Sequence, residues 1–244
     1  MLKKLFGLQS KKKHDLFYTT DLHSHLIPGI DDGVSSLEES VEIISNMKDL
    51  GFKKMITTPH IMPHRFPNTK EIILSGCERV NKELEYRKID IVLEAAAEYY
   101  FDEHFLEDIE NKNLLTFSNN FVLFEMSYTT KPFGLDQTIF NLFSKGYMPV
   151  LAHPERYSFL YSDMKKYDSL RNTGIYFQIN LNSLLGFYGK KPKQAANYLV
   201  ENGMVDFIGS DTHSMKYFQS FKKGTQSILV EKIFENNRIK NDIL

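Results

Sequence analysis

Histidine and carboxylate residues recur in this sequence directly after short apolar runs. The motif D-L-H-S-H at 21–25 follows such a run, and D-T-H at 211–213 follows another. Residues two apart in an extended segment point the same way, so His23 and His25 should face one site together with Asp21. Two imidazoles placed like this can share a divalent metal ion. Asp21 would then either bind the ion or hold a histidine tautomer from behind.

The same placement recurs at four further points, which are His60, Glu98, Glu125 and His153. Glu125 comes directly after F-V-L-F, where a carboxylate is costly to bury without a neighbouring cation or hydrogen-bond donor. Glu94 competes with Glu98, since it lies four residues earlier in the same run and shares its parity. Nitrogen and oxygen ligands from six chain segments would together form a multi-metal hydrolytic site.

The loops after these runs carry further candidates. I-D-D-G at 30–33 is typical of a turn, but it would close over the proposed site, so either Asp31 or Asp32 can bind a metal ion. His64 follows T-P-H at 58–60, and we interpret it as a rim residue or a phosphate contact. Arg156 ends A-H-P-E-R, where its planar guanidinium suits bidentate phosphate binding; an ion pair with Glu155 is the alternative.

The elements that must position these residues alternate between strand and helix along the chain. Strand-like runs lie near 17–23, 54–58, 91–97, 121–126, 148–152, 175–180 and 206–210. Apolar spacing and capping residues, with Asn68 opening the second helix, predict helices at 37–50, 68–87, 136–145, 164–172, 193–202 and 218–236. This alternation predicts parallel βαβ units in one α/β domain at 17–244. A barrel would bring the strand ends to one face, and an open doubly wound sheet is the alternative.

Composition bounds the class of protein. With 244 residues, 42% of them hydrophobic, the chain can bury the core of one large domain. Its 30 basic and 31 acidic side chains balance, so no overall field favours nucleic acid as a partner. A single cysteine excludes an internal disulfide and a thiolate zinc cluster, and it fits a reducing cytoplasm. No apolar stretch approaches the roughly 20 residues that span a bilayer, so we expect no transmembrane segment.

Some features are assigned no part in the site. We interpret residues 1–16 as a basic, flexible segment, with a weak membrane-surface tether as the alternative. His14 and His104 lie in polar or helical surroundings. Cys77 lies in a predicted helix, and Glu83 stands where phosphatases with a cysteine nucleophile often have an arginine six positions on. Neither a G-x-S-x-G elbow nor a phosphate-binding G-x-x-x-x-G-K-[ST] loop is present.

Taken together, these motifs resemble the PHP superfamily (polymerase and histidinol phosphatase). They are most similar to its bacterial manganese-dependent protein-tyrosine phosphatases of capsule and exopolysaccharide operons, the CpsB/CapC type. The motifs of that branch occur here in order as D-L-H-S-H, I-D-D-G, T-P-H, A-E-Y-Y, F-E-M, A-H-P-E-R and S-D-T-H. The resemblance covers about residues 21–213 and implies a distorted (β/α)7 TIM-like barrel that hydrolyses protein phosphotyrosine without a cysteine nucleophile.

The resemblance also implies a ligand set for three divalent metal ions per chain. One ion would be held by His23, His25, Glu98 and Asp211. Glu98 would bridge to a second ion that is shared with Glu125 and His153. The third ion would be held by Asp32, His60 and His213. Manganese is the first choice, with iron or zinc as alternatives, because nitrogen and oxygen ligands alone do not choose among them.

The same comparison assigns the phosphate contacts. Arg156 matches a phosphate-binding arginine of the branch. A second arginine normally follows the last histidine, and Lys216 is the candidate in its place, although a lysine cannot reproduce a bidentate contact. Aromatic side chains at the edge of the site would pack against a tyrosine leaving group. The loop candidates for this aromatic rim are Phe66, Tyr99, Tyr128, Phe133, Phe187 and Tyr188.

The expected reaction is hydrolysis of a phosphate monoester by a metal-activated hydroxide. Glu98 and Glu125 would act through the shared ions, and Arg156 would neutralise charge on the phosphoryl oxygens. The alternatives are a phosphatase for a small molecule such as histidinol phosphate, a nuclease or editing module, and a non-catalytic metal-binding scaffold.

By resemblance, the expected partner is a phosphotyrosine protein, namely a membrane-associated bacterial tyrosine kinase of polysaccharide export. A homo-oligomer is compatible with the sequence. We expect a cytoplasmic protein, brought near the membrane by its substrate or by the segment at 1–16.

Overall fold

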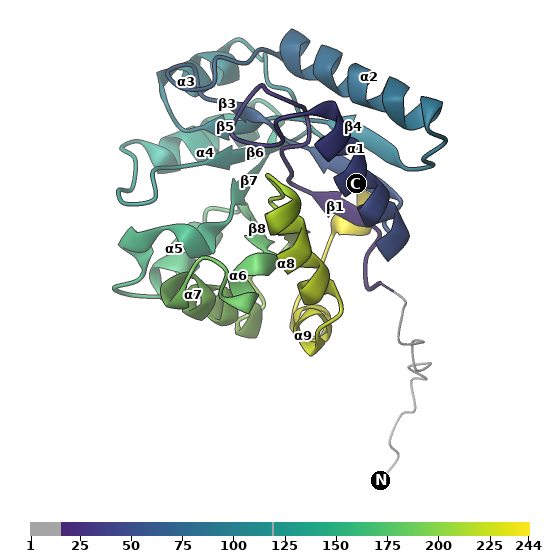
Figure 1. Cartoon of the computed structure of the whole chain (residues 1–244). Coiled ribbons are helices and arrows are strands. Elements are labelled where there is room, and N and C mark those ends of the chain that lie inside the picture. The colour runs from purple at the N-terminus through teal and green to yellow at the C-terminus, as the bar shows by residue number, and fades with distance from the viewer. Residues whose placement is uncertain (1–15, 119) are drawn as a thin grey trace.

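The computed structural model describes residues 16–118 and 120–244 (Figure 1). The basic segment expected at 1–16 lies outside these ranges except for its last residue, and His14 lies outside them too. The domain boundary at residue 17 therefore stays a prediction. None of the helices in these ranges combines the length and the apolar composition that a membrane span requires.

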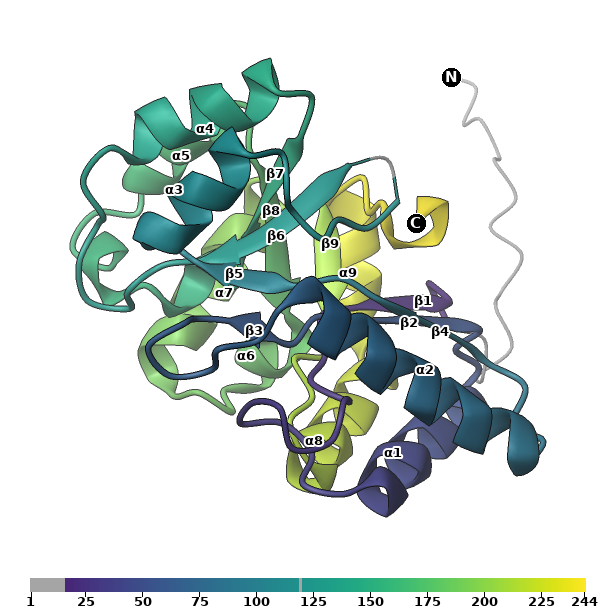
Figure 2. The same cartoon turned by 90° about the horizontal axis from the view of Figure 1, so that it is seen from above.

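Parallel strands form the centre of the molecule. They are β1 (Thr20–Leu22), β2 (Lys54–Thr57), β3 (His60–Ile61), β4 (Val92–Ala95), β5 (Glu98–Tyr100), β6 (Phe121–Glu125), β7 (Met148–Ala152), β8 (Tyr176–Asn180) and β9 (Phe207–Gly209). The hydrogen-bonded orders are β1-β2-β4 and β3-β5-β6-β7-β8-β9, with every neighbouring pair parallel. Figure 2 shows these strands side by side inside the helices.

The two sheets are parts of one closed barrel. β2 leads into β3 across Pro59, and β4 leads into β5 across two alanines, so a further short strand follows each of the strands predicted at 54–58 and 91–97. The ring closes where the Asp211 amide donates to the carbonyl of His23 at 2.8 Å, beside a parallel bridge between Ser24 and Thr212. These observations confirm the distorted barrel with seven strand positions among the described residues. The open doubly wound alternative is wrong.

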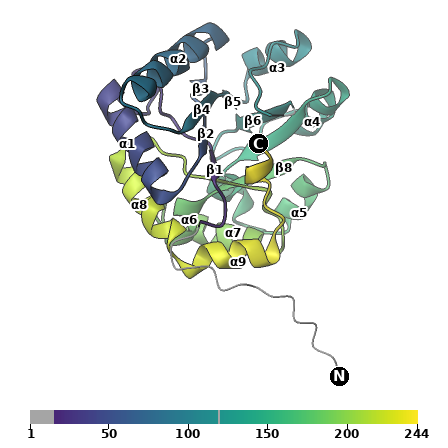
Figure 3. The ribbon, with the colours of Figure 1, turned by 90° about the vertical axis from the view of Figure 1, so that its right-hand side faces the viewer.

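Helices surround the barrel on its outer side (Figure 3). They are α1 (Leu37–Leu50), α2 (Lys70–Tyr86), α3 (Glu103–Glu110), α4 (Leu135–Ser144), α5 (Lys166–Arg171), α6 (Leu181–Leu185), α7 (Lys190–Glu201), α8 (Met215–Thr225) and α9 (Ile228–Asn236), with short 3-10 turns η1 (Pro154–Arg156), η2 (Ser158–Leu160) and η3 (Asn241–Ile243). Helix α1 ends as its sequence predicts, at Gly51 in the left-handed region with φ 107°. The helices α3 and α6 are not among the predicted ones, and the predicted helix at 218–236 is two helices that meet near Ser227.

One helix start differs from the prediction in a way that bears on the site. The cap of α2 is Thr69, whose side chain accepts from the amide of Ile72, rather than Asn68. Asn68 is buried and donates instead to the carbonyls of Ile30 and His60, at 2.9 and 2.8 Å. It therefore joins the I-D-D-G loop to the end of β3.

The interior of the barrel is apolar below its carboxyl ends. A buried cluster fills it with Leu22, Ile56, Ala96, Phe117, Phe121, Leu123, Val150, Ala152 and Phe207. A larger apolar layer packs between the strands and the surrounding helices. The polar side chains at the carboxyl ends of the strands therefore lie directly above an apolar interior. Charges interact strongly there because the local dielectric is low.

Candidate metal centre

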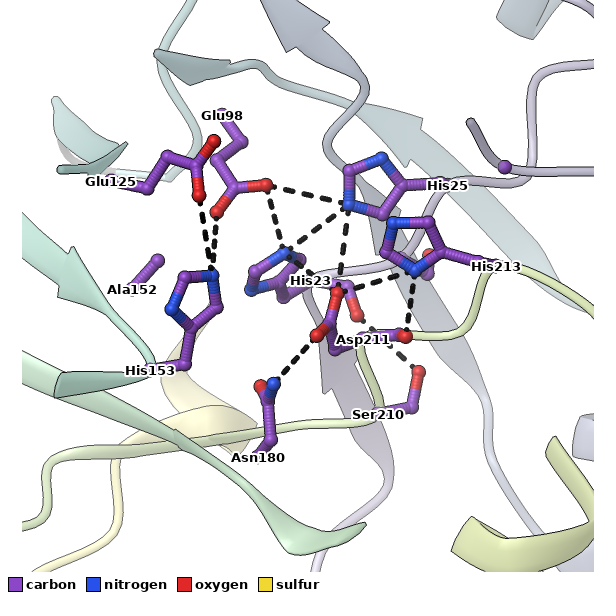
Figure 4. A network of polar contacts seen from close by, with 12 residues as sticks. His23, His25, Glu98, Glu125, Ala152, His153, Asn180, Ser210, Asp211 and His213 are labelled. Carbon is purple, nitrogen blue, oxygen red and sulfur yellow. Dashed lines mark hydrogen bonds and ion pairs between the residues drawn. The ribbon is translucent and has the colours of Figure 1, made fainter. Parts of the chain in front are cut away.

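The carboxyl ends of the strands and the loops after them gather the predicted ligands in one place. Figure 4 shows His23, His25, Glu98, Glu125, His153, Asp211 and His213 around this point. Groups whose ligand atoms lie within 4.8 Å of one another are His25-Asp32-His60-His213, His23-Glu98-His153, His23-His25-Asp211 and His60-Glu98-Glu125. These groups contain all nine ligand candidates, and within the described residues no such group includes any other residue. Because the groups overlap, the assignment of ligands to individual ions stays a prediction.

Glu98 lies at the centre of the cluster. Its Oε2 is 3.1 Å from His23 Nε2 and 3.3 Å from His60 Nδ1, and its Oε1 is 3.1 Å from His153 Nε2. The carboxylate is fully buried, which disfavours its charge, yet the histidines His23 and His60 hold its pKa well below the usual value. A carboxylate with ligand groups on both of its oxygens is suited to bridge two cations.

Asp211 forms the wall on the side of β9. Its Oδ1 lies 3.3 Å from His23 Nε2 and 3.4 Å from His213 Nδ1, while its Oδ2 accepts from Arg156 at 3.0 Å. Burial opposes the charge of Asp211, but His23, His213 and Arg156 lower its pKa. It therefore stays ionised and available to a cation.

Asp32 faces the same cavity from its mouth. Its Oδ1 is 3.5 Å from His60 Nε2 and 3.4 Å from His213 Nε2, and its side chain is 40% exposed. Asp31 lies behind, where it accepts from His25 Nδ1 at 2.7 Å and from the backbone amide of His60 at 3.1 Å. The sequence left open which of the two aspartates could bind a metal ion. In the structure, Asp32 belongs to a group of ligand candidates and Asp31 does not.

The structure also distinguishes Glu94 from Glu98 as a ligand candidate. Glu94 is exposed on β4 and pairs with Lys54 at 2.6 Å. Glu98, by contrast, is fully buried and lies 3.1 Å from the imidazole nitrogens of His23 and His153. Only Glu98 of the two faces the cluster.

The charges of the cluster shift histidine pKa values in opposite directions. Burial opposes protonation of His23, but Glu98 and Asp211 outweigh it and raise its pKa to about 9. Burial and then the charge of Arg156 lower the pKa of His153 to about 4. The carboxylates therefore attract positive charge, while His153 is a neutral imidazole, the form that binds metal ions.

Two observations fit divalent cations. Burial and then the charge of Glu98 raise the pKa of Glu125 to about 8, so a positive charge is needed there to keep both carboxylates ionised. His60 Nδ1 is buried without a hydrogen bond, although Glu98 and Glu125 lie 3.3 and 3.4 Å away. These nitrogen and oxygen atoms fit manganese, iron or zinc by ligand type.

Backbone strain marks three of the ligand candidates. His23, His153 and Asp211 have φ values of 84°, 33° and 48°, a region that non-glycine residues rarely adopt. Such conformations cost of order 1–3 kcal/mol each and persist only where the surroundings over-determine them. His23 and His153 directly follow β1 and β7, and Asp211 stands two residues after the end of β9, so the strained backbone turns these side chains into the site at the strand ends.

β8 supplies supporting residues that sequence reasoning missed. His23 Nδ1 donates to Gln178 Oε1 at 2.7 Å, Gln178 Nε2 donates to Asn180 Oδ1 at 2.9 Å, and Asn180 Nδ2 donates to Asp211 Oδ2 at 2.6 Å. This chain of three bonds orients ligand candidates from β1 and β9. Gln178 and Asn180 alternate with Phe177 and Ile179, and that period of two was the signal available in the sequence.

Asp21 has a different role from the one expected of it. Its carboxylate accepts from the amide and the hydroxyl of Ser210 at 2.9 and 2.7 Å, and no hydrogen bond from a histidine ring is described for it. Burial outweighs these donors and raises its pKa to about 7. Asp21 therefore ties β1 to β9 beneath the cluster instead of fixing a histidine tautomer.

The cluster opens into a cavity of about 840 Å³. Arg156 lines it, with its guanidinium carbon 4.7 Å from the ring centre of Tyr128 and 4.4 Å from that of Tyr188. The predicted phosphate contacts His64 and Lys216 are not among the lining residues. His64 lies near His104, and Lys216 Nζ lies 5.8 Å from the ring of Phe187, so their substrate roles gain no support from their positions.

The expected aromatic rim is only partly present. Tyr128 lines the cavity, and Tyr100 and Tyr217 do so as well, although neither was a candidate. Tyr99 is buried, with its hydroxyl bonded to the amide of Leu115, and it is not a rim residue.

Cys77 lies away from this cavity. It is buried in α2, where Asn81 donates to its sulfur at 3.5 Å, and burial raises its pKa to about 11. A thiol in that state is a poor nucleophile. The packing role expected for Cys77 agrees with its position.

Comparison with known proteins agrees with this geometry. A family model described as "Capsular polysaccharide synthesis, CpsB/CapC" matches residues 19–240. Tyrosine-protein phosphatase CpsB of Streptococcus agalactiae is 30% identical over 201 residues, which are 80% of this chain and 83% of that protein. Tyrosine-protein phosphatase YwqE of Bacillus subtilis is 28% identical over 197 residues, which are 80% of this chain and 78% of that protein.

A solved structure is similar over the same span. It comes from a study of YwqE from Bacillus subtilis and CpsB from Streptococcus pneumoniae, described there as unique metal-dependent tyrosine phosphatases. The TM-score is 0.75 at 27% sequence identity, and the match covers 89% of this chain and 92% of that one.

Proposed function

Because the chain belongs to the CpsB/CapC family of capsular polysaccharide synthesis, we propose that it is a metal-dependent protein-tyrosine phosphatase. The observation that carries the proposal is the convergence of nine nitrogen- and oxygen-bearing side chains in one cluster, which opens into a cavity that Arg156 also lines. The names of the relatives support phosphotyrosine as the substrate and capsule synthesis as the setting.

The proposed metal ligands are the nine residues that the sequence resemblance indicated. Glu98 belongs to two of the groups, one with His23 and His153 and the other with His60 and Glu125. This shared membership supports its role as a bridge. The number of ions, three, and the choice of manganese belong to this proposal. Divalent ions held there would lower the pKa of a bound water and offset charge on phosphoryl oxygens.

The protein's own groups orient the substrate. Arg156 keeps its charge in the buried site and presents a planar guanidinium to the cavity, so it can bind two non-bridging phosphoryl oxygens. The rings of Tyr128 and Tyr188 hold that guanidinium in place. The apolar floor of the barrel excludes water from below, which strengthens these electrostatic contacts. No thiol lies in the cavity lining to form a phosphoenzyme.

The rival functions are weaker. A non-catalytic scaffold would not need all nine ligand candidates, yet every one of them faces the cluster. A nuclease lacks support from the charge balance of 30 basic and 31 acidic side chains. A small-molecule phosphatase remains the nearest alternative, because the same centre would hydrolyse any phosphate monoester that fits the cavity.

We further propose a membrane-associated tyrosine kinase of polysaccharide export as the substrate protein, and a cytoplasmic location near it. Both rest on the family to which the chain belongs.

A substrate panel tests the function. The purified protein is assayed with a phosphotyrosine peptide, a phosphoserine peptide and histidinol phosphate, each with added Mn²⁺ and with a chelator. We expect hydrolysis of the phosphotyrosine peptide that depends on the metal, together with about three metal ions per chain by elemental analysis. Faster turnover of histidinol phosphate would favour the small-molecule alternative. Full activity after removal of every metal would refute the mechanism.

A further inference from the structure

A second guanidinium lies at the mouth of the cavity, on the side of Asp32. Arg65 lines the cavity, and its Nη2 is 3.5 Å from Asp32 Oδ2. The side chain is 64% exposed, so it can meet a ligand that enters from solvent. A distance of 3.5 Å exceeds the usual 2.7–3.2 Å of an N–H···O bond. The donors of Arg65 are therefore not all engaged by this carboxylate.

Short-range contacts hold the loop that carries Arg65. The amides of Arg65 and Phe66 both donate to the carbonyl of Met62, at 2.8 and 2.6 Å, and the amide of Met62 donates back to Phe66 at 3.1 Å. The ring of Phe66 lies parallel to the imidazole of His60, at 9° and 5.4 Å between centres. The guanidinium carbon of Arg65 lies 4.7 Å from the centre of the same ring.

Imidazole, phenyl ring and guanidinium thus form a stack that begins at a proposed metal ligand and ends at the cavity mouth. Asn68 fixes the base of this stack, since its side chain donates to the carbonyl of His60. The position of Arg65 relative to the metal centre is consequently built into the loop and is not left to a free side chain.

Arg156 is constructed in the same manner on the side of Asp211. Its guanidinium also lies on aromatic faces and also approaches a carboxylate that is a proposed metal ligand, here Asp211 at 3.0 Å. Lys216, which the sequence suggested as the second cation, is outside the lining and lies near Phe187 instead. Arg65 is therefore the better placed partner of Arg156.

We propose that Arg65 binds the phosphoryl group of the substrate from the side of Asp32, so that two guanidinium groups hold it over the metal centre. The inference rests on the proposed function, because it assumes a phosphate monoester as the ligand. Arg65 is separated from the cluster only by the carboxylate of Asp32, which contacts Arg65 on one side and the histidines His60 and His213 on the other. This closeness favours the phosphoryl group over more distant residues of a peptide.

The test uses full-length protein loaded with Mn²⁺. The variants are Arg65→Ala, Arg65→Lys and Lys216→Ala, with Arg79→Ala as the control because Arg79 is an exposed arginine on α2 outside the cavity lining. Metal content is measured first, then the Kd of inorganic phosphate by calorimetry, and then KM and kcat with a phosphotyrosine peptide that has neutral flanking residues.

We expect Arg65→Ala to keep the metal content of the wild type and to weaken phosphate binding about 10-fold, as one charge-assisted contact predicts. KM should rise by a similar factor, while kcat changes by less than about 3-fold. Arg65→Lys should recover part of the loss, because it keeps the charge but not the planar fork. The control should match the wild type, and Lys216→Ala should weaken phosphate binding less than Arg65→Ala.

Several outcomes would overturn the proposal. These are an unchanged phosphate Kd in Arg65→Ala, no phosphate binding by the wild type, a larger loss in Lys216→Ala, or an effect confined to peptides with acidic flanks. Phosphate binding that depends on Arg65 in a protein that fails to hydrolyse phosphotyrosine would instead refute the proposed substrate and leave the phosphate contact standing.

Discussion

Replacement of Gln178 by methionine should weaken metal binding without touching any proposed ligand. Gln178 is fully buried and accepts from His23 Nδ1 at 2.7 Å, which leaves the Nε2 of His23 facing Glu98 and Asp211. It also donates to Asn180 Oδ1 at 2.9 Å. Methionine has nearly the same length and no comparable hydrogen bond, so Gln178→Met removes both contacts with little change in volume.

The size of the effect follows from those two bonds. A supporting hydrogen bond behind a metal-bound histidine is worth about 10- to 100-fold in metal affinity, or roughly 1.4 to 2.7 kcal/mol. The substitution also leaves the His23 N–H and the Asn180 carbonyl oxygen buried without partners, at about 1–3 kcal/mol each. We therefore expect the free energy of unfolding to fall by about 2–6 kcal/mol and the Kd for Mn²⁺ to rise at least 10-fold.

The assay separates these two effects with matched variants. Mn²⁺ affinity is measured by competition with a chelating dye, and the free energy of unfolding by urea titration of the metal-free protein. Gln178→Glu keeps an acceptor for His23 and should hold Mn²⁺ within a few-fold of the wild type. Asn237→Leu removes buried hydrogen bonds to Val205, Val200 and Ile233 near the opposite end of the barrel, so it should destabilise the fold and leave metal affinity unchanged.

The reasoning fails if Gln178→Met binds Mn²⁺ as tightly as the wild type while its stability falls. His23 would then be oriented by its other contacts, and the bonds along β8 would matter for folding only. Equal losses of metal affinity in Gln178→Met and Asn237→Leu would also refute it, because the effect would then track stability.

Three further changes test the site. The folded-state pKa of Glu125 is raised from 4.5 to about 8, so the folded metal-free protein keeps a proton that the unfolded chain releases, and its stability should fall as pH rises from 4.5 through 8. The melting temperature of metal-free Glu125→Gln should therefore exceed that of the metal-free wild type at pH 9 but not at pH 4.5. The variant should also lose phosphatase activity. Full activity together with full metal content would refute the shared-ion mechanism. Cys77→Ala should keep kcat and KM and lose about 1 kcal/mol of stability, whereas a collapse of kcat would revive a thiol nucleophile. Tyr188→Leu, which removes the ring beside Arg156, should raise KM about 5-fold, and Tyr188→Phe should stay within about 2-fold; equal KM values for both would exclude the stacking role.

Much of the fold and the membership of the cluster could be predicted from local pattern. Apolar runs marked every strand position, and the polar residue after each run marked its carboxyl end, as at Glu125 after Phe121–Phe124. In a parallel barrel those ends must meet, so residues as distant as His23 and Asp211 were expected together before any coordinates. Their roles as metal ligands stay predictions.

Pattern failed where the outcome depends on contacts between distant segments. Asn68 resembles a helix cap, but the carbonyls of Ile30 and His60 compete for its side chain, and Thr69 caps the helix instead. The resemblance named Lys216 as the second phosphate contact, and no local pattern indicated Arg65, which the folded loop at Met62–Phe66 places in the cavity lining.

Local sequence was enough to place histidines and carboxylates at the ends of the strands, because alternation along an extended chain decides which side chains face inward. The folded arrangement was needed to distinguish Asp31 from Asp32 and Glu94 from Glu98, and to identify Gln178 as a support for His23. In each case the deciding factor is an ion pair or a hydrogen bond that forms only after distant segments meet, and no periodicity within a single segment contains that information.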